Sequence, residues 1–127
     1  MVIQRMIDIE DEVRKALSGH LTVYCRPLPK NFQMPCILVS KTGGFDEKQI
    51  DHMEIVLDSR ADTEYNADLT LRNAIGILKA VSAEQTTAIR HVQVNSSGSW
   101  GQDPVRPDIA LCSASLTCWA HPENITI

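Results

Sequence analysis

The stretch DIALCSASLTCWA, residues 108–120, alternates between two kinds of side chain and decides the fold. Every second residue from Ala110 to Ala120 is apolar or a cysteine, whereas Ser113, Ser115 and Thr117 fall between them. Successive side chains of a β-strand point to opposite faces of a sheet, so this alternation predicts a strand with one buried face. The chain is therefore expected to build a layered fold around a sheet.

Four further segments predict strands. They are LTVYCR at 21–26, CILVSKT at 36–42, HMEIVLDS at 52–59 and IRHVQVNS at 89–96. In the third, Met53, Ile55 and Leu57 are expected to face the core. Gly43 and Gly44 interrupt the second, so we expect a hairpin with a long tip between Thr42 and Ile50.

Two segments have the 3.6-residue period of amphipathic helices. The first, MIDIEDEVRKALSGH, is expected to end near Ser18, before a glycine that suits a helix C-terminus. The second runs from about Asp62 to Ser82. Gly76 inside it weakens the helix, which favours the close approach of another element there.

These elements predict an α+β domain in the order α-β-β-β-α-β-β. We expect a mostly antiparallel sheet of about five strands with two helices packed on one face. Residues 1–127 form one domain in this interpretation, and residues 122–127 are expected to be a flexible tail.

Composition excludes several classes of protein. The 127 residues contain 12 basic and 16 acidic side chains, a formal net charge of −4, and no basic cluster of the kind that grips nucleic acid. No apolar run approaches the roughly 18 residues of a membrane span, and no signal peptide is visible, so synthesis in the cytoplasm is expected. The cysteines at 25, 36, 112 and 118 lie in apolar segments and are predicted to be buried free thiols.

No pattern in the sequence indicates catalysis. Cys112, Cys118 and His121 supply only half of a zinc-binding motif, no serine lies in a nucleophile elbow, and no cofactor motif occurs. His52 and Glu54 are interpreted as solvated surface. The sequence therefore predicts a protein that is not an enzyme and has no metal or cofactor.

Two segments remain as candidate binding surfaces, the loops expected at Thr42 to Ile50 and Ser96 to Pro107. Trp100 and Arg106 in the second are residue types enriched at interface anchors. The alternative is that Trp100 folds back over the rim of the core. The residues alone are consistent with both interpretations of Trp100.

The order of these features resembles the tail-terminator and head-to-tail joining proteins of long-tailed bacteriophages, including prophages. The resemblance covers nearly the whole chain and is carried by a W-x-x-D-P and R-P loop, here Trp100, Asp103-Pro104 and Arg106-Pro107. Asp108 departs from the family pattern, since a larger residue is more usual there. The segment RADTEYNAD, residues 60–68, is also more acidic than expected.

The resemblance implies a structural virion protein that forms a ring, typically a hexamer, at the head-proximal end of the tail. It would be assembled in the host cytoplasm, and its partners would be itself, the tail tube protein and the head connector, with DNA only passing through. The expected interface residues are Gly43, Gly44, Phe45, Asp46, Lys48, Trp100, Asp103, Pro104, Arg106 and Pro107. The alternative is a monomeric adaptor that captures a peptide at an exposed sheet edge.

Overall fold

A computed structural model describes all 127 residues as two helices and seven strands. The helices are α1 (Ile9–Leu17) and α2 (Glu64–Glu84), and the strands are β1 (Val2–Arg5), β2 (Val23–Cys25), β3 (Cys36–Glu47), β4 (Ile50–Ala61), β5 (Ile89–Gln102), β6 (Ala110–Ala120) and β7 (Glu123–Thr126). Five strands form one sheet in the order β2-β3-β4-β6-β5, in which only the β2–β3 pair is parallel. The predicted α+β class and mostly antiparallel sheet are confirmed.

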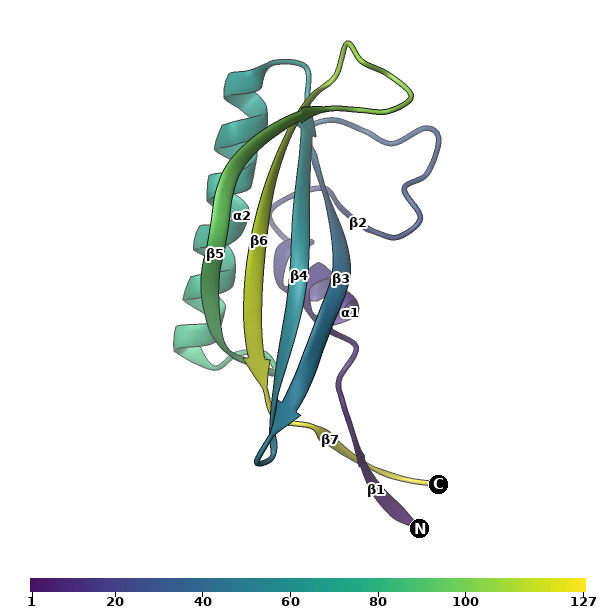
Figure 1. Ribbon diagram of the computed structural model, residues 1–127, viewed down its shortest axis with the longest axis vertical. Coiled ribbons are helices and arrows are strands. Elements are labelled where there is room, and N and C mark those ends of the chain that lie inside the picture. The colour runs from purple at the N-terminus through teal and green to yellow at the C-terminus, as the bar shows by residue number, and fades with distance from the viewer.

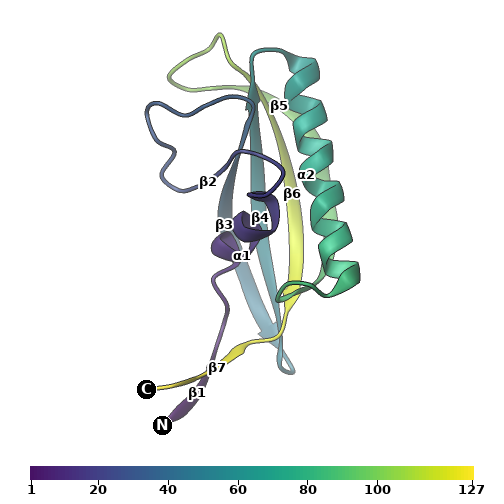
Figure 2. The same cartoon turned by 180° about the vertical axis from the view of Figure 1, so that it is seen from behind.

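Both helices cover the same face of this sheet. They lie behind it in Figure 1 and in front of it in Figure 2. Helix α1 packs on β2 and β3, whereas α2 packs mainly on β4, β5 and β6. The opposite face, called the open face below, has no helix over it.

The alternation seen in the sequence places the core between the helices and the sheet. Met53, Ile55 and Leu57 of β4 are fully buried, as predicted, and belong to one cluster of 22 buried residues. None of the four cysteines forms a disulfide. Burial raises the pKa of the Cys118 thiol to about 12, so this thiol stays protonated and behaves as an apolar group.

Local capping explains where the helices begin and end. The Asp8 side chain accepts a hydrogen bond from the backbone N–H of Asp11 at the start of α1, and Thr63 does the same for Asn66 at the start of α2. Helix α2 ends at Gln85, which has a left-handed backbone. The expected close approach at Gly76 is wrong, because no atom lies within 4 Å of where its Cβ would be.

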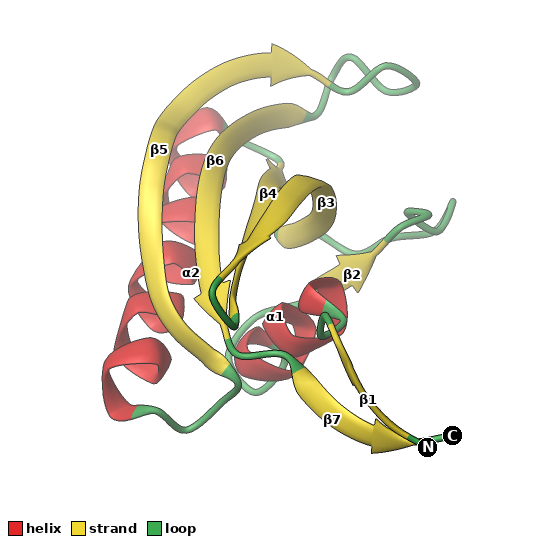
Figure 3. Ribbon diagram, turned by 60° about the horizontal axis from the view of Figure 1, so that its bottom comes forward, coloured by secondary structure: helices red, strands yellow, loops and turns green.

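The flexible tail expected at residues 122–127 is also wrong. Glu123–Thr126 forms β7, which pairs with β1 in register Val2 to Thr126, and Arg5 forms an ion pair with Glu123. This two-stranded arm extends away from the main sheet (Figure 3). The partner strands lie at opposite ends of the chain and are mostly exposed, so neither periodicity nor a turn signal predicts them.

The two expected loops are mostly strand. β3 and β4 continue to a two-residue turn at Lys48 and Gln49, whose φ angles of 47° and 70° are those of a tight hairpin turn. Gly43 and Gly44 lie inside β3, beside a bulge after Lys41. Strand β5 likewise runs to Gln102, so only the residues from 103 to 109 form the second loop.

Candidate interaction surfaces

The first candidate surface is a row of rings across the open face. The register of the antiparallel strands aligns Phe45 with His52, His52 with Trp119, and Trp119 with His91. The Phe45 and His52 rings stack with centroids 4.6 Å apart, and Trp119 meets His52 edge-on at 5.2 Å. The His91 ring is tilted against Trp119 at 4.5 Å. We call these four residues the aromatic row.

Hydrogen bonding ties His52 into this row. Trp119 Nε1–H donates to His52 Nε2 at 3.0 Å, and a nitrogen that accepts carries no proton, so this geometry belongs to the neutral imidazole. Glu47 Oε2 lies 3.7 Å from the same nitrogen, where it would pair only with a protonated ring. The row is therefore a packed, hydrogen-bonded unit rather than separate surface side chains.

The aromatic row is not predicted from the sequence. His52 lies on the outer face of its strand, as predicted, but the interpretation of His52 and Glu54 as solvated surface is wrong for His52. His52 is in fact half-buried between Phe45 and Trp119. The aromatic row results from the register in which the strands pair, because this register brings together residues up to about seventy positions apart. The sequence of one strand does not contain this information.

The second candidate surface is a pocket of about 510 Å³ at the other end of the sheet, where the loop after β2 meets the loop after β5. It is called the loop pocket below. Its lining combines apolar groups with three basic residues and one acidic residue. The lining residues are Leu28, Pro29, Lys30, Phe32, Arg60, Asp103, Pro104, Val105 and Arg106.

A buried ion pair forms the floor of the loop pocket. Arg60 Nε donates to Asp103 Oδ2 at 2.8 Å, and less than a tenth of either side chain is exposed. Asp103 Oδ1 also accepts the backbone N–H groups of Val105 and Arg106, each at 2.9 Å. The pair therefore fixes the second loop to the end of β4.

Electrostatics keep Asp103 ionised. Burial alone would raise the pKa of this carboxyl group, but the hydrogen bond from Arg60 and those from the backbone of Arg106 and Val105 together lower it below its ordinary value of 3.8. The negative charge is thus balanced inside the protein. Asp103 is a structural anchor for its loop, not an exposed contact.

Arg60 still has a free hydrogen-bond donor. Its Nη1 is buried and has no partner, although the residue lines the loop pocket. Lys30 is exposed on the rim and forms no ion pair, and Arg106 has only a 3.6 Å contact with Asp108. A buried donor without an acceptor is costly, so the loop pocket is suited to a group that is both apolar and negatively charged.

The structure divides the predicted interface residues between the two ends of the sheet. Gly43, Gly44, Phe45, Asp46 and Lys48 belong to the hairpin of β3 and β4, and Asp103, Pro104 and Arg106 line the loop pocket. Pro107 lies beside a separate, more polar hollow with Asp62 and Glu64. No single site contains all ten.

Trp100 is not on a loop, contrary to the prediction. It lies in β5 opposite Cys112, whose side chain belongs to the core, so the indole points toward the helix side of the sheet. About half of the residue is exposed. It is therefore separated by the sheet from both surfaces of the open face.

The structure explains why residue 44 is a glycine. Its φ of 154° is combined with a very close approach of β4, because a Cβ there would lie 2.5 Å from the carbonyl oxygen of His52. The glycine therefore allows the hairpin strands to pair just after the bulge. It supports the aromatic row through His52 rather than acting as a turn.

No group of three or more His, Cys, Asp or Glu side chains is arranged to hold a metal ion. Neither helix combines the length and the apolar character needed to cross a lipid bilayer. Comparison with known proteins adds no relative, since no protein-family model matches the chain and no curated protein sequence matches it.

Proposed function

We propose that the protein is a structural ring subunit at the head-proximal end of a long-tailed phage tail, where it ends growth of the tail tube and joins it to the head connector. One observation carries the proposal: helices cover one face of the sheet, and the other face stays open with two unlike surfaces at its ends. A half-exposed ring system and an apolar pocket suit burial against partners. The resemblance of the Trp100 to Pro107 segment supports the assignment to phage tails.

The two unlike surfaces suit a closed ring. Contacts between identical subunits in a ring are head-to-tail, so each subunit needs two different, complementary patches. The hairpin end has Phe45 with the acidic Asp46 and Glu47, whereas the loop pocket has an excess of basic residues. A chain of net charge −4 also suits a passage that DNA crosses without being held.

We assign the protein no catalytic role and no cofactor. The ionisable side chains at the centres of its two candidate surfaces are already engaged internally: His52 Nε2 accepts from Trp119, and Asp103 is paired with Arg60. A general base needs a free nitrogen or oxygen within reach of a substrate proton. The proposed partners are further copies of this chain, the tail tube protein and the head connector, within the virion.

The competing function is a monomeric adaptor that adds a peptide strand to the edge of the sheet. It is favoured by β5, a 14-residue edge strand whose outer side is unpaired. Three irregularities of register interrupt β5, at His91, Ser96 and Ser99. Bulges of this kind hinder regular pairing with another strand, so the ring is the better supported proposal.

Size-exclusion chromatography with light scattering tests the ring directly. Across a wide concentration range the protein should shift from monomer to a closed species of about six subunits, which negative-stain images would show as rings. Purified tail tubes added to the monomer should produce the same species at the tube end. A chain that stays monomeric even with tubes present would contradict the proposal and favour the adaptor.

A further inference from the structure

We propose that the hairpin tip of one copy, residues 45–51, docks in the loop pocket of the next copy. This inference rests on the proposed ring and specifies its contact. The tip brings an aromatic ring and carboxylates, and the loop pocket offers apolar walls, free cations and an unpartnered arginine donor. The occupant is thus a second copy of this chain.

The loop pocket defines what its occupant must supply. Arg60 Nη1 needs a hydrogen-bond acceptor, and Lys30 and Arg106 at the rim favour that acceptor being negatively charged. Leu28 and Phe32 favour an apolar group beside it. A volume of about 510 Å³ is in the range that holds a few side chains.

The hairpin tip supplies these groups. The Phe45 side chain faces outward from the open face and the residue is 55% exposed. Asp46 is exposed and forms no ion pair, and it stands directly opposite Asp51 in the strand register. Arg5 and Lys48 of the same chain line one hollow with Asp46 and Asp51, so the charge that the tip presents to a partner is carried by Asp46 and Glu47 beside one lysine.

A second unpartnered atom belongs to Asp51, at the base of the tip, which lines a separate hollow with Arg5 and Lys48 of the same chain. Asp51 is 96% buried, given a relative exposure of 4%, and its Oδ2 has no hydrogen-bond donor. The only two buried side-chain atoms without partners in the molecule are this acceptor and the Arg60 donor. They lie at opposite ends of β4, one beneath the tip and one in the loop pocket.

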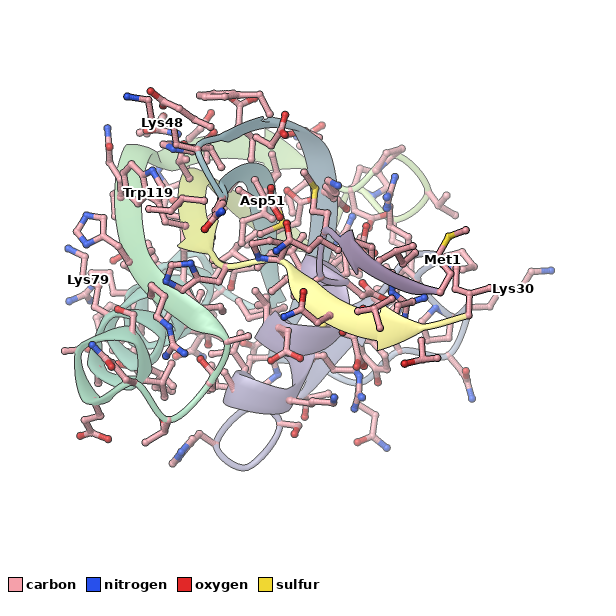
Figure 4. The ribbon with its side chains drawn as sticks, turned by 90° about the horizontal axis from the view of Figure 1, so that it is seen from below. Met1, Lys30, Lys48, Asp51, Lys79 and Trp119 are labelled. Carbon is pink, nitrogen blue, oxygen red and sulfur yellow. The ribbon has the colours of Figure 1, made fainter.

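The geometry requires a contact between copies. Asp51 and Arg60 lie near the two ends of β4, and the stretch of strand between them spans about 30 Å, so the tip cannot enter its own pocket. Figure 1 shows the hairpin at the lower end and both loops at the upper end. In the view from below, Lys48 of the tip and Lys30 of the pocket rim are well separated (Figure 4).

Charge exchange tests the contact. The pocket variant is Lys30→Glu/Arg106→Glu and the tip variant is Asp46→Lys/Glu47→Lys. Each should weaken ring assembly at least tenfold in light scattering, because like charges would then meet. The chain that combines all four changes should regain assembly to within a few-fold of the unmodified protein.

Two control variants distinguish the effect of a local contact on assembly from the effect of a changed net charge. Arg72→Glu/Lys79→Glu, both on the exposed side of α2, gives the same net charge as the pocket variant, and Glu64→Lys/Glu84→Lys matches the tip variant. Both should assemble normally. Urea unfolding of every variant verifies that the fold is retained.

The outcomes distinguish the two proposals. Rings that persist in both charge variants would overturn the docking contact but leave the ring intact. A defect only in the pocket variant, with no rescue, would assign the pocket to another anionic occupant and also overturn the contact. Absence of any association by the unmodified chain, with tail tubes as well as without them, would remove the ring proposal itself.

Discussion

The two faces of the sheet differ in how they depend on the sequence. On the helix side, buried side chains such as Leu57 and Leu116 pack into one cluster, and any apolar group of similar volume serves there. On the open face, specific partners matter: His52 meets Trp119, and Arg60 meets Asp103. Alternation thus defines which residues share a face, whereas strand pairing defines which side chains meet on that face.

The largest effect is expected from breaking the ion pair of the open face. Asp103→Ala leaves Arg60 charged and buried without its partner, which typically costs about 3–5 kcal/mol of unfolding free energy. Urea denaturation followed by circular dichroism measures this loss. The second loop should also become more sensitive to protease, since Asp103 holds it.

A double variant is the control for Asp103→Ala. Arg60→Met/Asp103→Leu removes both charges and keeps similar volumes, so it should be clearly more stable than the single variant. A double variant that is as unstable as Asp103→Ala would show that packing, not charge, dominates this site.

Two neighbouring residues of β4 allow the contributions of the two sheet faces to the free energy of unfolding to be compared. Leu57→Ala removes a fully buried side chain from the core and should cost about 2–5 kcal/mol in urea denaturation. Val56→Ala, on the open face and half-exposed, should cost clearly less. Equal losses would mean that the open face is as tightly packed as the core, contrary to the structure.

Acid titration should reveal the contribution of Asp103. Its pKa in the folded protein is lower than 3.8, so the unfolded chain binds the proton more readily. The stabilisation is therefore complete above the unfolded pKa and is lost as pH falls through the folded pKa. Unfolding free energy measured between pH 7 and pH 2 should decline at the acid end.

Removing the carboxyl group should flatten part of that decline. Asp103→Asn should show a weaker dependence of unfolding free energy on pH below about 4 than the unmodified protein. Asp108→Asn, at an exposed carboxyl group, should leave the profile almost unchanged. Identical profiles for the two variants would contradict the role of Asp103.

These differences explain how far the sequence could predict the molecule. The strand of residues 108–120, the buried positions of β4 and both helices follow from periods of 2 and 3.6 residues. The tight turn at Lys48-Gln49 was missed because neither residue is a glycine, although both have positive φ angles. The two glycines that suggested a loop serve a bulge instead.

The candidate surfaces were predictable only in part. The segments at 43–48 and 103–107 were identified by their residue types, and they do lie at the two ends of the sheet. Arg60, His52 and Trp119 were missed, because their significance depends on partners 43 and 67 residues away. The contact of His52 with Trp119 follows from the register of β4 and β6, and that of Arg60 with Asp103 follows from the path of the loop after β5, neither of which a single sequence reveals.

A smaller effect is expected from the aromatic row. Phe45→Ala removes the stacking on His52, and aromatic pairs contribute about 0.5–1.5 kcal/mol beyond the area they bury. The loss should appear in urea denaturation at protein concentrations where the chain is monomeric. Phe45→Leu keeps the apolar volume, so comparison of the two variants isolates stacking from burial.

The smallest effect concerns the outer side of the helix layer, where no partner is seen. Gly76 is exposed in the middle of α2, and Gly76→Ala should stabilise the monomer by about 0.5–1 kcal/mol, because alanine favours a helix and its Cβ would meet no atom within 4 Å. Thermal unfolding measures this gain. A loss of stability would show that the helix is packed more closely than the structure describes.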